Sequence, residues 1–195
     1  SDLTSGKLWS VENFGIKPDV LVFAKALTNG LNPLSGLWAR EELINPTVFP
    51  PGSTHSTFAS NPLGTAIGLE VMKMTHEIDF GHQVRESGAY FLEGLRELQK
   101  RHKEIGDVDG IGLALRAEIC TEDGFTPNKA LLDRMVDIGL AGDLEYQGQK
   151  RGLVLDVGGY YKNVITFAPS LMITRAEIDE AMVLLDQLLT RAKQA

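Results

Sequence analysis

The stretch that decides the fold is Lys17-Pro18-Asp19-Val20-Leu21-Val22-Phe23-Ala24-Lys25-Ala26-Leu27. Its centre, residues 19–24, is a short Val-rich apolar run that begins at a Pro-Asp turn. Such a run is typical of a strand buried on both faces, as in a parallel sheet. A Gly/Asn/Pro loop at 28–33 and a second apolar run at 34–39 follow. The sequence therefore predicts an α/β region in which Lys25 stands at the carboxyl end of a strand.

The position of Lys25 makes it the first candidate for chemistry. In α/β sheets, ligands gather outside the carboxyl ends of the strands. A lysine that is partly desolvated there gives up its proton more easily and can attack a carbonyl group. From spacing alone, an ordinary surface lysine at a strand end is the alternative interpretation.

The rest of the chain alternates helix and strand patterns, and its character changes near residues 75–80. This change predicts two domains, residues 1–78 and 79–195. Gly64 and Gly68, on the helix after Asn61-Pro62, would let another backbone come close. The expected strands lie at 112–119, 152–157 and 164–168, and the expected helices lie at 40–44, from Asn61-Pro62 onward, at 82–103, at 128–138 and at the end of the chain. The last helix opens with the capping box Thr174-Arg175-Ala176-Glu177. Three of the helices carry an apolar stripe: Leu63, Ile67, Val71 and Met74 in the helix from Asn61-Pro62, Tyr90, Leu92, Leu95 and Leu98 in the helix at 82–103, and Ile178, Met182, Leu185 and Leu189 in the last helix.

Composition excludes several classes of protein. The chain has 195 residues, of which 43% are hydrophobic, and a net charge of −7 without blocks of like charge. A nucleic-acid groove or an anionic membrane surface would require clustered Lys and Arg, so neither partner is expected. The apolar runs are too short to span a bilayer. Cys120 is the only cysteine, which favours a reducing, cytoplasmic location. The first residues lack an initiator Met and a secretory signal, which suggests a fragment or a processed chain.

The stretch around Lys25 closely resembles the active-site segment of class III, or omega-type, aminotransferases. The resemblance includes Gly6-Lys7-Leu8-Trp9 and Phe14-Gly15 before the stretch and Asn32-Pro33-Leu34-Ser35-Gly36 after it. In that family the lysine forms a Schiff base with pyridoxal 5'-phosphate. The resemblance extends from Gly6 to Ala192. It implies an α/β, fold-type I pyridoxal-phosphate-dependent transferase, in which residues 1–78 are the C-terminal part of the large parallel-sheet domain. Residues 79–195 would be the small C-terminal α+β domain, and Lys25 would be both catalytic and cofactor-binding.

A second segment, Thr54-His55-Ser56-Thr57-Phe58-Ala59-Ser60-Asn61-Pro62-Leu63, resembles the family segment whose Thr hydrogen-bonds the cofactor phosphate. Thr57 is the matching position, and in the family this Thr usually serves the active site of the partner subunit. A hydroxyl beside a helix start can join backbone N–H groups around a phosphate. The resemblance thus implies a homodimer with shared active sites. Without it, the segment is an ordinary loop with a helix N-cap.

A third segment, residues 163–174, resembles the final strand of the family and the turn into its last helix. Many members carry Arg or Lys where this chain has Thr166, and such an Arg can hold a substrate carboxylate as a bidentate fork. Thr cannot do so. Arg116 and Arg151 are possible substitutes, although a surface or structural role is the simpler interpretation of each. A surface or structural role is also the simpler interpretation of His55.

A complete member of the family is much longer than this chain. Its upstream half supplies a phosphate-binding turn with Gly, an aromatic residue on the pyridine ring, and an Asp that keeps the pyridine nitrogen protonated. Asp2 is not in the Asp-Glu context of the family and is not assigned that role. We therefore expect the 195-residue chain alone to bind pyridoxal phosphate weakly or not at all, and an upstream half or companion chain to complete the site.

The expected reaction is transamination between an amino donor, either an amino acid or an amine, and a keto acid. Lys25 would act as general base and then as general acid. No metal ligands are assigned. Three alternatives stay open: racemisation or phospho-lyase chemistry on the same fold, a non-catalytic dimerisation module or fragment, and a nucleotide-binding protein. The last is weak because Gly110-Ile111-Gly112 lacks the rest of a dinucleotide fingerprint.

Overall fold

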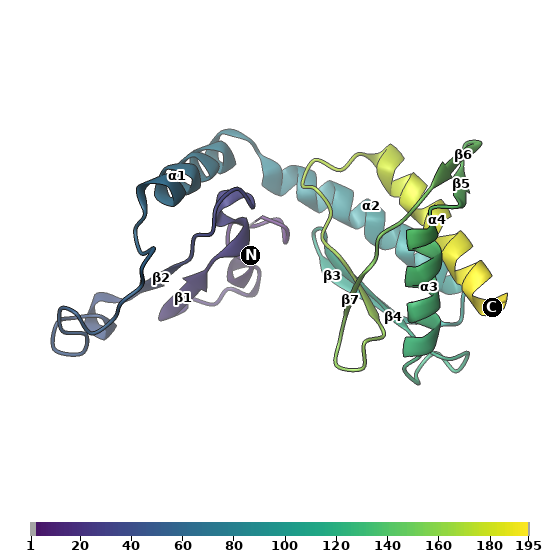
Figure 1. The fold of residues 1–195 in the computed structure, drawn as a ribbon, viewed down its shortest axis with the longest axis horizontal. Coiled ribbons are helices and arrows are strands. Elements are labelled where there is room, and N and C mark those ends of the chain that lie inside the picture. The colour runs from purple at the N-terminus through teal and green to yellow at the C-terminus, as the bar shows by residue number, and fades with distance from the viewer. Residues whose placement is uncertain (1–2, 195) are drawn as a thin grey trace. The chain divides into compact units, whose positions relative to one another are not determined.

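A computed structural model of the protein describes residues 3–194 (Figure 1). The chain divides into two compact units, Ser1–Gly81 and His82–Ala195. Asp2 lies outside the described residues. None of the helices within the described range has both the length and the apolar character that crossing a membrane requires.

Unit 1 is built on a two-stranded antiparallel ribbon and one long helix. Strands β1 and β2 pair with Val20 opposite Ala39 and Phe23 opposite Gly36. The ring of Phe23 packs 5.4 Å from the ring of Trp9, centroid to centroid. Its elements are η1 (Ser10–Phe14), β1 (Val20–Phe23), η2 (Lys25–Thr28), β2 (Gly36–Ala39), η3 (Glu41–Leu43) and α1 (Pro62–Glu77).

The prediction that the strand before Lys25 is buried on both faces is wrong for this chain. Val22 is 73% exposed and Val20 is 45% exposed. The physical reason is the size of the sheet, because β1 and β2 form a ribbon of two strands with no layer of unit 1 over these side chains. The strand itself and the following run are confirmed as β1 and β2.

Helix α1 begins as the sequence predicts. The side chain of Asn61 caps it, with the Gly64 N–H donating to Asn61 Oδ1 at 2.7 Å. Gly64 and Gly68 are its buried residues, and a Cβ on Gly68 would lie 3.0 Å from Leu34 Cδ2 and 3.7 Å from the Leu27 carbonyl oxygen. The two glycines thus allow the loop after Lys25 to approach the helix closely, as predicted. The apolar stripe is wrong at its ends, because Leu63 and Met74 are exposed.

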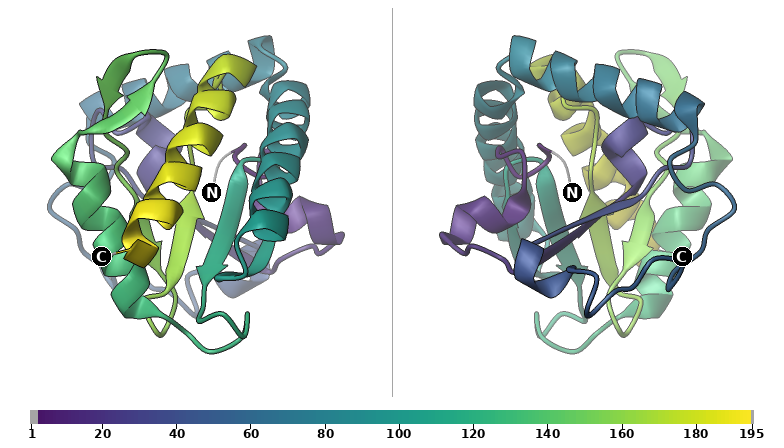
Figure 2. Two further views of the ribbon diagram at one scale, coloured as in Figure 1. Left: turned by 90° about the vertical axis from the view of Figure 1, so that its right-hand side faces the viewer. Right: turned by 90° about the vertical axis from the view of Figure 1, so that its left-hand side faces the viewer.

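Unit 2 is a four-stranded antiparallel sheet in the order β3-β4-β8-β7, with an additional β5–β6 hairpin. Side chains alternate along β4, with Leu115, Ala117 and Ile119 buried and the residues between them more exposed. Figure 2 shows the helices α2, α3 and α4 gathered on one side of this sheet. The elements are α2 (Phe80–Arg101), β3 (Ile105–Ile111), β4 (Ala114–Ile119), α3 (Lys129–Ala141), β5 (Leu144–Tyr146), β6 (Gln149–Arg151), β7 (Asp156–Gly158), β8 (Val164–Phe167) and α4 (Arg175–Gln194).

Two strand predictions in unit 2 need correction. Strand β3 was not predicted, because its two Gly and two Asp residues disfavour a strand and its register shifts at Gly106. The predicted strand at 152–157 is wrong over most of its length, and only its end belongs to β7. Leu153 N–H donates to the carbonyl of Gly139 at 3.1 Å, so this segment contacts α3 instead of a neighbouring strand.

The helices of unit 2 follow the predicted patterns with one exception. The capping box of α4 is confirmed, since Thr174 N–H donates to Glu177 Oε2 at 2.8 Å and Glu177 N–H donates to Thr174 Oγ1 at 3.3 Å. On α2 the buried stripe runs through Val84, Phe91, Leu95 and Leu98. Tyr90 is not part of it, because its hydroxyl donates to Asp179 Oδ1 at 2.6 Å on the exposed side, a hydrogen bond that raises the Tyr90 pKa.

Candidate functional site

Lys25 stands where β1 ends and the short helix η2 begins. Its backbone is in the left-handed region, with φ of 57°, whereas Ala24 before it is extended. This reversal turns the chain sharply out of the strand direction. The lysine side chain is exposed, so the expectation of partial desolvation is not met within this chain.

Lys25 lines an open hollow of about 540 Å³ in unit 1. The hollow brings Lys25 together with a stretch some 30 residues downstream, which contributes Ser56 and Ser60, and with Ser35 at the start of the run that becomes β2. Apolar walls come from Pro33, Leu34 and Phe58. One primary amine thus shares a cavity with several hydroxyl groups.

Thr57 does not belong to this hollow, although its neighbours Ser56 and Phe58 line it. The side chain is exposed. The two residues that the sequence singled out therefore do not meet in one cavity of the described chain. The hollow instead contains Ser35, Ser56 and Ser60, which sequence reasoning missed. The polar run Ser53-Thr54-His55-Ser56-Thr57 was the available signal, but it does not tell which hydroxyl groups point toward Lys25.

The lining of the hollow fits part of a pyridoxal phosphate site. An exposed amine can bond covalently to an aldehyde, and serine hydroxyls can hydrogen-bond a phosphate. The lining residues include no carboxylate and no second cation, so none of them could pair with a pyridine nitrogen or clamp a phosphate by charge. The residues present fit the covalent attachment of the cofactor, and the remaining contacts must come from elsewhere.

The arginines considered as carboxylate ligands are already engaged in unit 2. Arg116 Nη2 lies 2.7 Å from Asp107 Oδ2 across the β3–β4 pair. Arg151 Nε donates to Glu180 Oε1 on α4 at 2.8 Å. Thr166 donates its hydroxyl to Asp156 on the neighbouring strand. Both arginines thus have structural partners, which agrees with the simpler interpretation of each.

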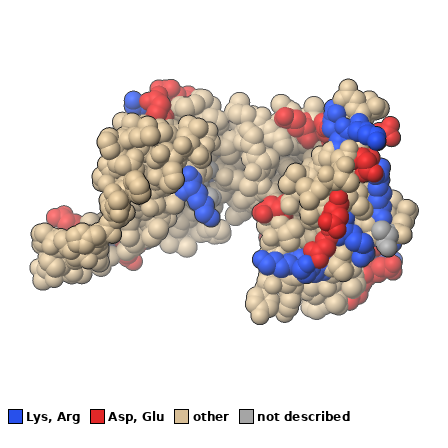
Figure 3. All heavy atoms as spheres, in the orientation of Figure 1, with Lys and Arg blue, Asp and Glu red and all other residues tan. Residues whose placement is uncertain are grey.

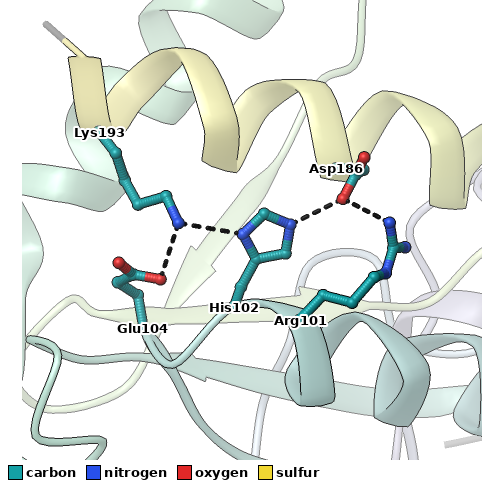
Figure 4. A network of polar contacts seen from close by, with 5 residues as sticks. All are labelled: Arg101, His102, Glu104, Asp186 and Lys193. Atoms are coloured by element: carbon teal, nitrogen blue, oxygen red, sulfur yellow. Dashed lines mark hydrogen bonds and ion pairs between the residues drawn. The ribbon is translucent and has the colours of Figure 1, made fainter.

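A partly buried ionisable cluster joins the end of α2 to α4 and was also missed from sequence (Figure 4). His102 is 6% exposed, and its Nε2 lies 2.7 Å from Asp186 Oδ1 while its Nδ1 lies 3.2 Å from Lys193 Nζ. Lys193 Nζ also donates to Glu104 Oε2 at 3.1 Å, and Arg101 Nη1 donates to Asp186 Oδ1 at 2.9 Å. Burial raises the pKa of Glu104, but its backbone hydrogen bond and Lys193 outweigh burial and hold that pKa below its usual range. Every charge in the cluster has a partner, so we interpret it as structural.

No group of three or more His, Cys, Asp and Glu residues is placed to hold a metal ion in the part of the chain that the structure describes.

Comparison with known proteins shows which sequences this chain is similar to. The chain is 33% identical over 189 residues to the acetylornithine aminotransferase of Caldanaerobacter subterraneus subsp. tengcongensis, covering 97% of this chain and 42% of the relative. It is 31% identical to the 4-aminobutyrate aminotransferase GabT of Escherichia coli, with 97% and 42% covered, and 29% identical to an alanine/serine racemase of Pyrococcus horikoshii, with 94% and 36% covered. The chain thus spans about two fifths of the length of the curated relatives it matches.

The fold of this chain is also similar to that of solved transaminase structures. A crystal structure of a new transaminase from the marine bacterium Virgibacillus superposes with a TM-score of 0.84 at 22% identity, over 98% of this chain and 43% of that one. This likeness confirms the mixed α/β, fold-type I architecture. Residues 4–189 match the family Aminotransferase class-III. The protein therefore belongs to the class III aminotransferases, a pyridoxal-phosphate-dependent family.

Proposed function

We propose that this chain carries the cofactor-anchoring lysine of a pyridoxal-phosphate-dependent transamination, and that this lysine is Lys25. The observation that carries the proposal is the hollow in unit 1, in which Lys25 is the only amine and several hydroxyl groups surround it. Membership of the class III family supports the same reaction. The substrates would be an amino donor, either an amino acid or an amine, and a keto acid.

In this reaction Lys25 has two tasks. Its amine would hold the cofactor covalently until the amino donor binds. The same amine would then remove a proton from the substrate α-carbon and give it back, as general base and then as general acid. The bound cofactor supplies the electron sink that makes this carbon acid strong enough. The exposed side chain of Lys25 supports this role, because its amine is open to the hollow.

The site requires protein from outside this chain. The lining of the hollow offers no group for the pyridine nitrogen, and the chain spans only about two fifths of its relatives. An upstream half or companion chain would supply these contacts. Unit 1 has many exposed apolar residues, among them Val20, Val22 and Trp38. An upstream half or companion chain would bury such a surface. Figure 3 shows few charged side chains on the visible face of unit 1.

We further propose that Thr57 binds the cofactor phosphate of a partner subunit in a homodimer. Its exposure and its position outside the Lys25 hollow support a role in another subunit. Residues 1–78 would then be the C-terminal part of the large domain, and residues 79–195 the small α+β domain. A single cysteine, Cys120, supports a cytoplasmic location.

The test is reconstitution followed by borohydride reduction and peptide mapping. The 195-residue chain alone should show weak or no Schiff-base absorbance with pyridoxal phosphate. Co-expression with the upstream half should restore that absorbance, place a pyridoxyl adduct on Lys25 and allow turnover of amino donors. Lys25→Arg in the same complex is the matched control and should lose all three. An unmodified Lys25 in the cofactor-saturated complex would favour a non-catalytic module instead. Full activity of the 195-residue chain alone would contradict the requirement for an upstream half.

Racemisation is the second candidate function, because one relative is named an alanine/serine racemase. Both reactions begin with proton removal at the same α-carbon, so Lys25 would serve either. Product analysis of the reconstituted enzyme separates them. Transamination consumes one keto acid for each amino donor, whereas racemisation inverts an amino acid without any acceptor.

A further inference from the structure

Thr28 is a fully buried polar residue at the end of the short helix that begins at Lys25. It is the one buried residue of η2 and is 0% exposed. Its hydroxyl donates to the backbone carbonyl of Asn32, and its own carbonyl accepts from the Leu31 N–H at 3.1 Å. Two hydrogen bonds therefore close residues 28–32 into one compact loop.

This loop connects two segments that line the Lys25 hollow. The first segment includes Lys25 at the start of η2, and the second is the run 33–35, which follows Asn32 directly. The Thr28 hydroxyl bonds the last residue of η2 to the residue just before that run. This hydrogen bond thus restrains the two lining segments relative to each other.

Helix α1 holds the second segment in place. A Cβ on Gly64 would lie 2.8 Å from Asn32 Oδ1, and a Cβ on Gly68 would lie 3.0 Å from Leu34 Cδ2. The loop is therefore packed closely against the helix. Because Asn32 is held by α1, the Thr28 hydroxyl ties the turn after Lys25 to a fixed part of unit 1.

We propose that Thr28 is a positioning residue for Lys25, which it keeps in a reactive geometry through its hydrogen bond to Asn32. The inference rests on the proposed attachment of the cofactor at Lys25. Attachment joins the neutral amine to the aldehyde carbon and releases one water, so no other reactant is needed. Such a step depends strongly on geometry, since misplacing a reacting group by about 1 Å can cost about 100-fold in rate.

The test separates covalent attachment from non-covalent binding in the complex with the upstream half. Stopped-flow absorbance at saturating pyridoxal phosphate gives the rate of Schiff-base formation. Calorimetric titration with 4'-deoxypyridoxine 5'-phosphate, which lacks the aldehyde, gives the non-covalent affinity. Thr28→Val keeps the shape of the side chain and removes the hydroxyl. We expect it to attach the cofactor about tenfold or more slowly and to bind the analogue with unchanged affinity.

Two further variants serve as controls. Thr28→Ser keeps the hydroxyl and should attach the cofactor at nearly the unaltered rate. Thr75 lies in the same unit and donates its hydroxyl to the Met72 carbonyl at 2.7 Å, but it does not line the hollow. Thr75→Val should therefore change neither rate nor affinity. Without cofactor, amide exchange at Leu31 should become faster in Thr28→Val and not in Thr75→Val.

The inference would be overturned by normal attachment in Thr28→Val, by slow attachment in Thr28→Ser, or by an equal loss in Thr75→Val. Equal losses of attachment rate and analogue affinity in Thr28→Val would also overturn it, because a merely structural defect lowers both. If Thr28→Val does not fold, Thr28→Ala and Thr28→Ser make the same comparison, since they differ only by the hydroxyl. Absence of attachment in the unaltered complex would instead refute the proposed function, and this inference with it.

Discussion

Lys25 adopts a left-handed backbone conformation that most residues other than glycine avoid. Such a conformation costs about 1–2 kcal/mol and is retained only where the surrounding structure enforces it. It lies at the junction of β1 and η2, at the residue that carries the candidate catalytic amine. The backbone strain and the chemistry thus occur at the same residue.

Comparing Lys25→Gly with Lys25→Ala tests this strain, because both variants lose the amine and only glycine relaxes the backbone. We expect the Gly variant to be more stable than the Ala variant by about 1 kcal/mol. Urea unfolding followed by tryptophan fluorescence is the measurement, since Trp9 and Trp38 are the two tryptophans of the chain and both lie in unit 1. Equal midpoints for the two variants would show that residue 25 is not left-handed in solution.

The cluster around His102 makes a second prediction about single residues. Lys193→Ala removes the cation from Glu104, whose side chain is only 10% exposed, and should lower the free energy of unfolding by about 3 kcal/mol. The matched control is Lys100→Ala, which breaks an exposed pair with Glu97 and should cost about 0.5 kcal/mol or less. Urea unfolding monitored by circular dichroism measures both. A similar loss in the two variants would argue against a special contribution of the buried cluster.

Individual elements show why glycines lie inside long helices of this chain. Gly88 and Gly94 both lie within α2, where glycine is less favourable than alanine by about 1 kcal/mol. A Cβ on Gly88 would lie 2.1 Å from the Gly112 carbonyl oxygen, whereas one on Gly94 would lie 2.9 Å from the flexible end of Met182. The close approach of the β3–β4 turn thus requires glycine at position 88 only.

This difference predicts opposite outcomes for two alanine variants of one helix. Gly88→Ala should be less stable than the unaltered protein by about 2–3 kcal/mol, because the methyl group meets backbone that cannot move away. Gly94→Ala should be close to neutral, since Met182 can change rotamer and alanine favours the helix. Thermal unfolding of the two variants and of the unaltered protein, followed by circular dichroism, is the measurement. A destabilised Gly94→Ala with a neutral Gly88→Ala would mean that the packing of α2 differs from the one described.

At the scale of the whole molecule, the two units differ greatly in how much core they contain. The continuous cluster of buried apolar side chains belongs to unit 2. Among the described residues of unit 1, Leu3 is the only buried hydrophobic side chain. Because burial of apolar surface is the main driving force of folding, unit 2 should be the more stable unit.

Amide hydrogen exchange on the 195-residue chain should reveal this difference. Backbone amides of α1 and β1 should exchange much faster than those of β4 and α4, because unit 1 opens without disturbing the core of unit 2. Adding the proposed upstream half should slow exchange in unit 1 and leave unit 2 unchanged. Uniform protection of both units in the isolated chain would contradict this prediction. It would also argue against an upstream half that packs on unit 1.

Much of the fold could be predicted from local patterns. Asn61 and Thr174 marked two helix starts correctly, because capping depends on residues three positions apart. Strand β3 escaped prediction because a glycine in it serves a close contact with a segment farther along the chain: a Cβ on Gly106 would lie 2.5 Å from the Gly124 carbonyl oxygen. The 152–157 segment was predicted wrongly because its backbone bonds to α3, a contact that no local pattern reports.

By itself, the sequence determined the family, the candidate lysine at the end of a strand, and most helices, since these depend on motifs and short-range spacing. Only the tertiary structure decided which hydroxyl groups share a cavity with Lys25, and that Arg116 and Arg151 are bound to carboxylates. The physical reason is distance along the chain. Side chains far apart in sequence become neighbours through strand register and helix packing, which local preferences do not specify.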